Sequence, residues 1–136
     1  MRKEFASFLH GEMSYNERIV LLTGDLGYGL WDQIKIDYPD RFYNVMSSEQ
    51  LMIGSAVGLA MEGFIPIVYS ITPFVIYRPF ELLRNYLDHE NIPVKLVGGG
   101  RNSVTDVPEP ETISIVSPGI CHISYPRYLY IGLDDY

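Results

Sequence analysis

The sequence predicts an α/β fold with a doubly wound, mostly parallel sheet and helices on both faces. Short apolar runs rich in β-branched residues recur along the chain, as expected for strands that are buried on both faces. Stretches with helical spacing separate these runs, which gives strand–helix–strand units. The length of 136 residues corresponds to a single domain, residues 1–136, with one hydrophobic core.

The first third of the chain is expected to form two strands and two helices. Apolar side chains recur at helical spacing over residues 3–13. Ile19–Thr23 is a continuous apolar run closed by a glycine-containing turn, which is typical of a buried parallel strand. A short helix is expected over Leu30–Asp37, since it must stop before Pro39, and a second strand over Phe42–Met46.

The middle of the chain continues the alternation. Ser47 or Ser48 can cap a helix that runs to about Glu62. This helix is expected to pack closely through its small residues, which are Gly54, Ser55, Ala56, Gly58 and Ala60. Three further elements follow: a strand over Ile65–Ser70, a helix from about Arg78 to Leu87 with Pro79 in its first turn, and a strand over Pro93–Val97.

The character of the chain changes after Gly100, where prolines accumulate and no helical period is visible. Ile113–Val116 and Tyr128–Ile131 are candidates for short strands. A tail that lies on a partner is the other interpretation of residues 101–136.

The amino-acid composition argues against several classes of protein. Ten basic against 17 acidic residues give a net charge of −7, which is the wrong sign for sequence-independent nucleic-acid binding. The single cysteine, Cys121, excludes an intramolecular disulfide, so a cytoplasmic location is expected. The N-terminus lacks the apolar core of a secretory leader. No membrane span is expected over Met52–Tyr77, because Glu62-Gly63 interrupts the run and Pro66 and Pro73 break its second half.

Ligands of doubly wound sheets bind at the carboxyl ends of the strands. Three loops fall there: Gly24–Tyr28, Met46–Glu49 and Gly98–Asn102. Glu49 is the most informative ionisable residue, since apolar Met52 and Ile53 follow it and desolvation would raise the pKa of its carboxyl group. The alternative is that Glu49 only favours the N-terminus of its helix.

Other motifs are weak. The chain has neither GxGxxG nor a Walker-type glycine loop, and Gly98–Gly100 fits a flexible strand exit at least as well as a ligand contact. Three classes of side chain lack a convincing functional pattern: the scattered His10, His89 and His122, which show no metal-ligand spacing; Cys121, which has no base nearby; and Phe74, Tyr77 and Phe80, which composition alone assigns to core or interface.

Several segments in order resemble one family. They are Thr23–Gly27 (TGDLG), Pro39–Val45 (PDRFYNV), Ser48–Gln50 (SEQ), Gly54–Ala60, Pro66–Ser70, Arg78–Glu81 with Arg84, and Asn91–Gly98. Together they cover about residues 1–100 and resemble the pyrimidine-binding (Pyr) domain of transketolase-like thiamine-diphosphate enzymes, as in a transketolase C-terminal section or split transketolase subunit. Residues 101–136 have no counterpart in it, and Met46-Ser47 and Ile71 depart from its usual residues.

The resemblance implies a cofactor site. Glu49 would hydrogen-bond N1′ of the cofactor's aminopyrimidine and promote the tautomer that generates the ylid for transfer of a two-carbon unit. Phe74 matches the aromatic residue that stacks on the pyrimidine, and Tyr77 matches a nearby position. Asp25 and Leu26 lie where the family supports the bent cofactor.

The resemblance also implies a partner. In this family a diphosphate-binding (PP) domain with a GDG motif holds Mg²⁺ and the diphosphate of the cofactor. This chain has no GDG motif, so no metal site is expected in it. A hetero-oligomer with a separate PP-domain chain is therefore expected. The subunit is also expected to self-associate through residues around Ile53, Val57 and Phe74–Phe80. The expected substrate is a ketose or a 2-oxo acid. Two other interpretations stay open: a non-catalytic Pyr-fold regulatory module, and a truncated relic of a transketolase.

Overall fold

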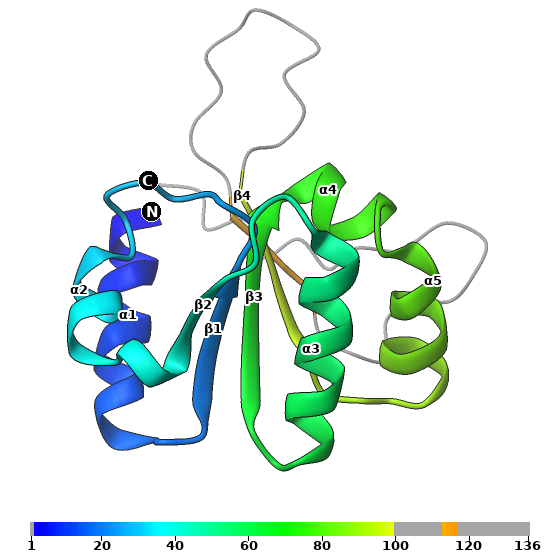
Figure 1. Ribbon diagram of the computed structural model, residues 1–136, viewed down its shortest axis with the longest axis horizontal. Coiled ribbons are helices and arrows are strands. Elements are labelled where there is room, and N and C mark those ends of the chain that lie inside the picture. The colour runs from blue at the N-terminus through cyan, green and yellow to red at the C-terminus, as the bar shows by residue number, and fades with distance from the viewer. Residues whose placement is uncertain (1, 100–112, 117–136) are drawn as a thin grey trace, which may run out of the picture.

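A five-stranded sheet forms the centre of the protein, in the order β2-β1-β3-β4-β5 (Figure 1). The computed structural model describes residues 2–99 and 113–116. Four strands run parallel: β1 (Ile19–Thr23), β2 (Phe42–Asn44), β3 (Ile65–Ile71) and β4 (Lys95–Gly99). The last strand, β5 (Ile113–Val116), pairs antiparallel with β4.

Helices cover both faces of the sheet. They are α1 (Arg2–Tyr15), α2 (Asp32–Asp37), the 3-10 turn η1 (Pro39–Arg41), α3 (Glu49–Met61), α4 (Thr72–Tyr77), α5 (Phe80–Leu82) and the π-helical η2 (Leu83–His89). In Figure 1, α1 and α2 lie on one side of the sheet, and α3, α4 and α5 lie on the other. The predicted doubly wound α/β fold is confirmed.

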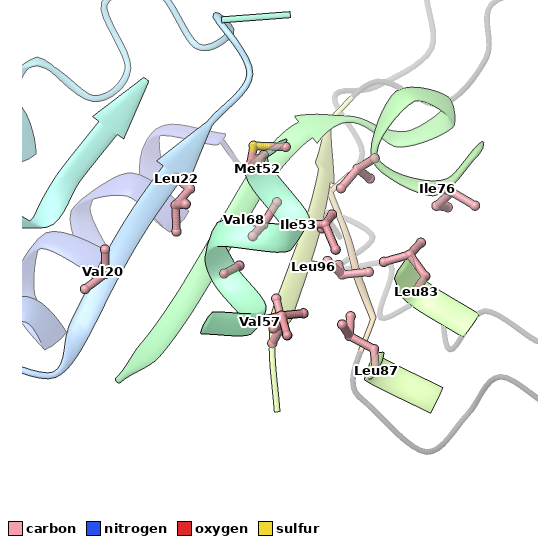
Figure 2. Close-up of a cluster of buried hydrophobic side chains, with 13 residues drawn as sticks. Val20, Leu22, Met52, Ile53, Val57, Val68, Ile76, Leu83, Leu87 and Leu96 are labelled. Atoms are coloured by element: carbon pink, nitrogen blue, oxygen red, sulfur yellow. The ribbon is translucent and has the colours of Figure 1, made fainter. Parts of the chain in front are cut away.

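Successive strand residues point to opposite faces and build two cores. On the side of α3, Leu22, Val68 and Leu96 pack among the buried side chains that Figure 2 shows. On the side of α1 and α2, Tyr69 and Val97 pack with the buried Leu9, Met13, Leu21, Trp31 and Ile34. Burial on both faces explains why these strands read as continuous apolar runs.

Two strand boundaries differ from the prediction. β2 ends at Asn44 instead of Met46, because the Asn44 side chain accepts a hydrogen bond from the backbone N–H of Met46 at 3.0 Å and Met46 adopts a left-handed conformation. β4 begins at Lys95 and continues through Gly98 to Gly99. Ile113–Val116 forms a strand as expected.

The helix α4 was not expected. Its residues, Thr72–Tyr77, are mostly β-branched or aromatic and so favour a strand by propensity. Pro73 lies in the first turn, where its fixed φ suits a helix start. After α4, Pro79 precedes α5, so the helical region expected from about Arg78 is present as α5 and η2.

The expected close packing of α3 through its small residues is confirmed for Ala56, which is fully buried in the core. It was wrong for Gly54 and Gly58: a methyl group at Gly58 would meet nothing within 4 Å, and one at Gly54 would only reach Leu82 at 4.0 Å. Ile53 and Val57 are buried in the chain's own core, so they do not face another subunit.

The helices of the described chain are all too short or too polar to cross a membrane. The sequence candidates Cys121, His122 and Tyr128–Ile131 lie outside the described residues.

Candidate active site at the carboxyl edge of the sheet

The strand order creates a topological switch point between β1 and β3. From β1 the chain moves outward to β2 and then returns through α3 to β3 on the other side of β1. Crevices at such points are the usual ligand sites of open α/β sheets. Three residues meet at this place: Gly24 after β1, Glu49 at the start of α3, and Ser70 near the end of β3.

The Glu49 carboxylate is buried at this switch point, with only 2% of the residue exposed. Its Oε1 atom accepts a hydrogen bond from Ser70 Oγ at 2.9 Å. Its Oε2 atom accepts one from Arg78 Nη1, also at 2.9 Å, in an ion pair. Hydrogen bonds to an ionised acceptor are the stronger kind, so both contacts hold the carboxylate in one orientation.

The expected rise in the pKa of Glu49 was wrong. Burial does raise the pKa of this carboxyl group, as the sequence suggested. However, hydrogen bonds from Arg78, from the backbone N–H of Glu49 and from Ser70, together with the Arg78 charge, outweigh burial and hold the pKa below its ordinary value of 4.5. The carboxylate is therefore ionised at neutral pH.

Gly24 leaves the room that the carboxylate uses. A methyl group at this position would lie 3.2 Å from Glu49 Oε1 and from Ser70 Oγ, and 3.4 Å from the Met46 carbonyl oxygen. The two 3.2 Å approaches are tighter than ordinary van der Waals contact, so a side chain at Gly24 would push the Glu49 carboxylate or the Ser70 hydroxyl aside by a few tenths of an ångström. The absence of a side chain at Gly24 thus leaves space for both groups.

Arg78 connects Glu49 to Phe74. Its guanidinium carbon lies 3.6 Å from the centre of the Phe74 ring, while Nη1 holds Glu49. Arg78 follows α4 directly, so the one-turn offset from Phe74 brings the cation over the ring. Arg78 lies in one of the segments that resemble the family, but the sequence analysis gave it no role. The position of an arginine in the sequence does not show which residues its long side chain contacts.

The remaining expected site residues lie around this group. Asp25 is exposed and has a positive φ of 56°, and Leu26 is half-buried against the core beside α1 and α2. The Leu26 carbonyl accepts a hydrogen bond from the Thr23 hydroxyl at 3.1 Å. Tyr77 is 69% exposed and Phe80 45% exposed, so of the two expected locations, core or interface, the core was wrong for both, and an interface stays a prediction.

Asn44 is a site residue that sequence reasoning missed. Its Oδ1 atom accepts hydrogen bonds from the backbone N–H groups of Asp25 and Met46, both at 3.0 Å, and its Nδ2 atom donates to Asp25 Oδ1 at 3.1 Å. Asn44 thereby joins the loop after β1 to the loop before α3. An asparagine at the carboxyl end of a strand, just before a turn, was the available signal.

Gly98 and Gly99 belong to β4 and have a packing role, so a flexible strand exit was wrong for these two, while a ligand contact there stays a prediction. A methyl group at Gly98 would collide with Thr72, including a 3.0 Å approach to its Cα atom. One at Gly99 would lie 2.5 Å from the Tyr69 hydroxyl oxygen. Gly98 and Gly99 therefore let β4 run against neighbouring side chains.

Other polar groups lie apart from Glu49. His10 Nε2 pairs with Asp37 Oδ2 at 2.8 Å between α1 and α2, and His89 is on the surface. A hollow of about 310 Å³ beside this pair, on the α1 side, is lined by residues that include Lys3 and Gln33, and it contains none of the expected site residues. Within residues 2–99 and 113–116, no three potential metal-ligating side chains cluster.

Known proteins match this sequence and this fold. Residues 1–108 match the family model described as "Transketolase, pyrimidine binding domain". A putative transketolase C-terminal section of Methanocaldococcus jannaschii is 35% identical over 98 residues, or 71% of this chain. A 1-deoxy-D-xylulose-5-phosphate synthase of Dehalococcoides mccartyi is 33% identical over 92 residues, or 66% of this chain.

A solved structure, described as "Split gene transketolase, inactive beta4 tetramer", superimposes with a TM-score of 0.58 at 31% identity, over 65% of this chain. The present chain spans 31% of the M. jannaschii protein, 14% of the D. mccartyi protein and 30% of the solved chain. The match is thus to one domain of larger proteins, and the family model covers most of the present chain. The chain belongs to the family of transketolase pyrimidine-binding domains.

Proposed function

We propose that this chain is the Pyr-domain subunit of a transketolase-like, thiamine-diphosphate-dependent enzyme, in which Glu49 activates the aminopyrimidine of the cofactor. The observation that carries the proposal is a buried carboxylate at the switch point of the sheet, with an aromatic ring connected to it through one side chain. A flat heterocycle with a basic nitrogen can stack on such a ring and hydrogen-bond to such a carboxyl group.

Each residue has a definite task in this proposal. The Glu49 carboxyl group holds a proton at N1′ of the aminopyrimidine, and Ser70 keeps its Oε1 atom oriented. Phe74 provides a stacking face, and Asp25 and Leu26 support the cofactor from the neighbouring loop, with Tyr77 at the rim. When bound, the cofactor supplies the carbanion chemistry that transfers a two-carbon unit from a ketose or 2-oxo acid.

The second half of the site is proposed to come from a partner chain with a PP domain, which holds the diphosphate and Mg²⁺. The names of the matched proteins, a C-terminal section and a split-gene transketolase, support a division between chains. The solved relative is described as inactive and as a tetramer, which favours self-association of the Pyr subunit without such a partner.

The test is a Glu49→Gln substitution in the assembled enzyme. The amide keeps the size of the side chain and can still accept from Ser70, but it cannot exchange a proton with N1′. We expect thiamine-diphosphate-dependent turnover to fall at least about 100-fold, the typical contribution of general acid–base catalysis, with the partner still bound. The matched control is Glu81→Gln, which alters an exposed Arg–Glu pair. Wild-type turnover in the Glu49 variant would contradict the assignment.

A regulatory, non-catalytic Pyr module is the second candidate. One observation favours it: Arg78 contacts both Glu49 and Phe74, the two groups that a catalytic subunit offers to the cofactor. Purification of the chain from its host, with identification of the proteins that accompany it, separates the two. An accompanying PP-domain chain whose activity requires this subunit supports the enzyme, and an accompanying complete transketolase supports the regulatory module.

A further inference from the structure

One side chain contacts both groups that the proposed function assigns to the aminopyrimidine. Arg78 Nη1 donates to Glu49 Oε2 at 2.9 Å, and the same guanidinium lies over the Phe74 ring with its carbon 3.6 Å from the ring centre. A guanidinium is planar, carries N–H donors and stacks on aromatic faces. In each of these properties it resembles an aminopyrimidine, so the two groups compete for the same carboxylate and the same ring.

We propose that in the cofactor-free chain Arg78 occupies the place of the aminopyrimidine between Glu49 and Phe74. Cofactor binding then displaces the Arg78 guanidinium from both residues. This inference rests on the proposed function, because it concerns the regulation of that same site.

The Arg78 side chain can move away from Glu49 and Phe74 without breaking other hydrogen bonds of the described residues. Its side chain is 44% exposed, and Glu49 is its only side-chain hydrogen-bond partner among the described residues. Glu49, by contrast, is buried and keeps the bond from Ser70 when Arg78 moves away. Displacement therefore transfers an arginine from a half-buried position into water, while the carboxylate stays in place.

The ion pair with Arg78 also favours the ionised form of Glu49 before the cofactor binds. Arg78 is the largest of the influences that hold the pKa of Glu49 below its ordinary value, against the opposing effect of burial. A carboxyl group that must hold a proton at N1′ is poorly suited to that task while this cation contacts it. Departure of Arg78 removes the strongest of the lowering influences and leaves burial to act in the direction that the chemistry needs.

The experiment measures binding of Mg²⁺–thiamine diphosphate by calorimetry to the full chain assembled with its PP-domain partner. We expect Arg78→Met to lower the dissociation constant about tenfold, which corresponds to about 1.4 kcal/mol, because a competing internal contact is removed. Arg84→Met is the matched control: Arg84 is also 44% exposed and also bonds a glutamate, Glu81, at 2.9 Å. Its dissociation constant should not change.

A second measurement does not depend on removal of the arginine. Nitrogen-15 NMR of the arginine side chains should show restricted rotation of the Arg78 guanidinium in the free chain and its release when thiamine diphosphate saturates the complex. Arg78→Lys, which keeps the charge but loses the planar group, should give an intermediate dissociation constant and serves if Arg78→Met does not fold.

The outcomes are distinct. Unchanged or weaker cofactor binding in the Arg78 variants, or a guanidinium that stays restricted in the saturated complex, would overturn the displacement while leaving the proposed function intact. Absence of cofactor binding in the wild-type complex and in every variant would overturn the proposed function and the displacement with it.

Discussion

Glu49 is held from three directions, and its ionisation is coupled to folding. Ser70, Arg78 and the N-terminal backbone of α3 all favour the charged form over the neutral one. The unfolded chain offers none of these contacts, so it binds a proton at this residue at a higher pH than the folded chain does. The corresponding stabilisation is complete above the ordinary pKa of 4.5 and is lost as the pH falls through the lower folded value.

We therefore expect Glu49→Gln to change the pH dependence of stability. At neutral pH the substitution should lower the free energy of unfolding by about 1 kcal/mol, since it removes an ion pair with a half-exposed arginine. The difference from wild type should shrink as the pH falls below 4.5 and through the lower pKa of the folded chain. Urea unfolding, followed by the fluorescence of the single tryptophan, the buried Trp31, measures both. A difference that is independent of pH would show that the carboxylate is not the linked group.

At the scale of whole elements, glycines in α3 and β4 have opposite effects on stability. Gly58 lies on an exposed face of α3 with open space around it, so it only weakens the helix. Gly98 lies in β4 beneath the first turn of α4, where a Cβ atom would approach Thr72 Cα within 3.0 Å. Close packing was expected at Gly58, but of these two glycines only Gly98 has a packing role.

Alanine substitutions should therefore have opposite effects. Gly58→Ala is expected to raise the free energy of unfolding by about 0.8 kcal/mol through helix propensity. Gly98→Ala is expected to lower it by about 1–3 kcal/mol, because α4 has to shift away from the strand. Chemical unfolding of both variants under one set of conditions measures the contrast. Effects of the same sign would contradict the different environments of the two glycines.

Burial decided which elements could be predicted from the sequence. Ile19–Thr23 was predicted to the residue, because a strand buried on both faces leaves a continuous apolar run with a sharp end. Thr72–Tyr77 was missed, because packing against the sheet overrides the strand propensity of its residues. Glu49 was located by its position before a helix, but the direction of its pKa shift depended on Arg78, 29 residues away, which local sequence does not reveal.

At the scale of the whole molecule, two exposed aromatic residues are close to Arg78 in the chain. Tyr77 and Phe80, which flank Arg78 along the chain, leave 69% and 45% of their surface exposed in this chain alone. Aromatic residues are enriched at protein interfaces. We expect this pair to be covered when the subunit assembles, whereas the buried Ile53 and Val57 stay in the core.

The change Tyr77→Ser tests this expectation. It should leave the unfolding of the isolated chain within about 0.5 kcal/mol of wild type, because the side chain makes few contacts there. It should weaken subunit association about tenfold or more, since aromatic residues dominate interface energetics. Sedimentation or calorimetric titration with the partner measures the association, and Tyr15→Ser, an exposed tyrosine on α1, is the control. Equal effects of the two substitutions would place Tyr77 outside the interface.

The contiguity of the site has a consequence for its inheritance. Glu49, Ser70, Phe74 and Arg78 all come from one segment, α3–β3–α4 and the residue after it, whose ends are 29 positions apart. A gene rearrangement that cuts the coding sequence before or after this segment moves the carboxylate, the hydroxyl, the ring and the guanidinium together. Such a break separates none of these four side chains from one another, but a break before α3 would separate them from Gly24, Asp25 and Leu26 in the loop after β1.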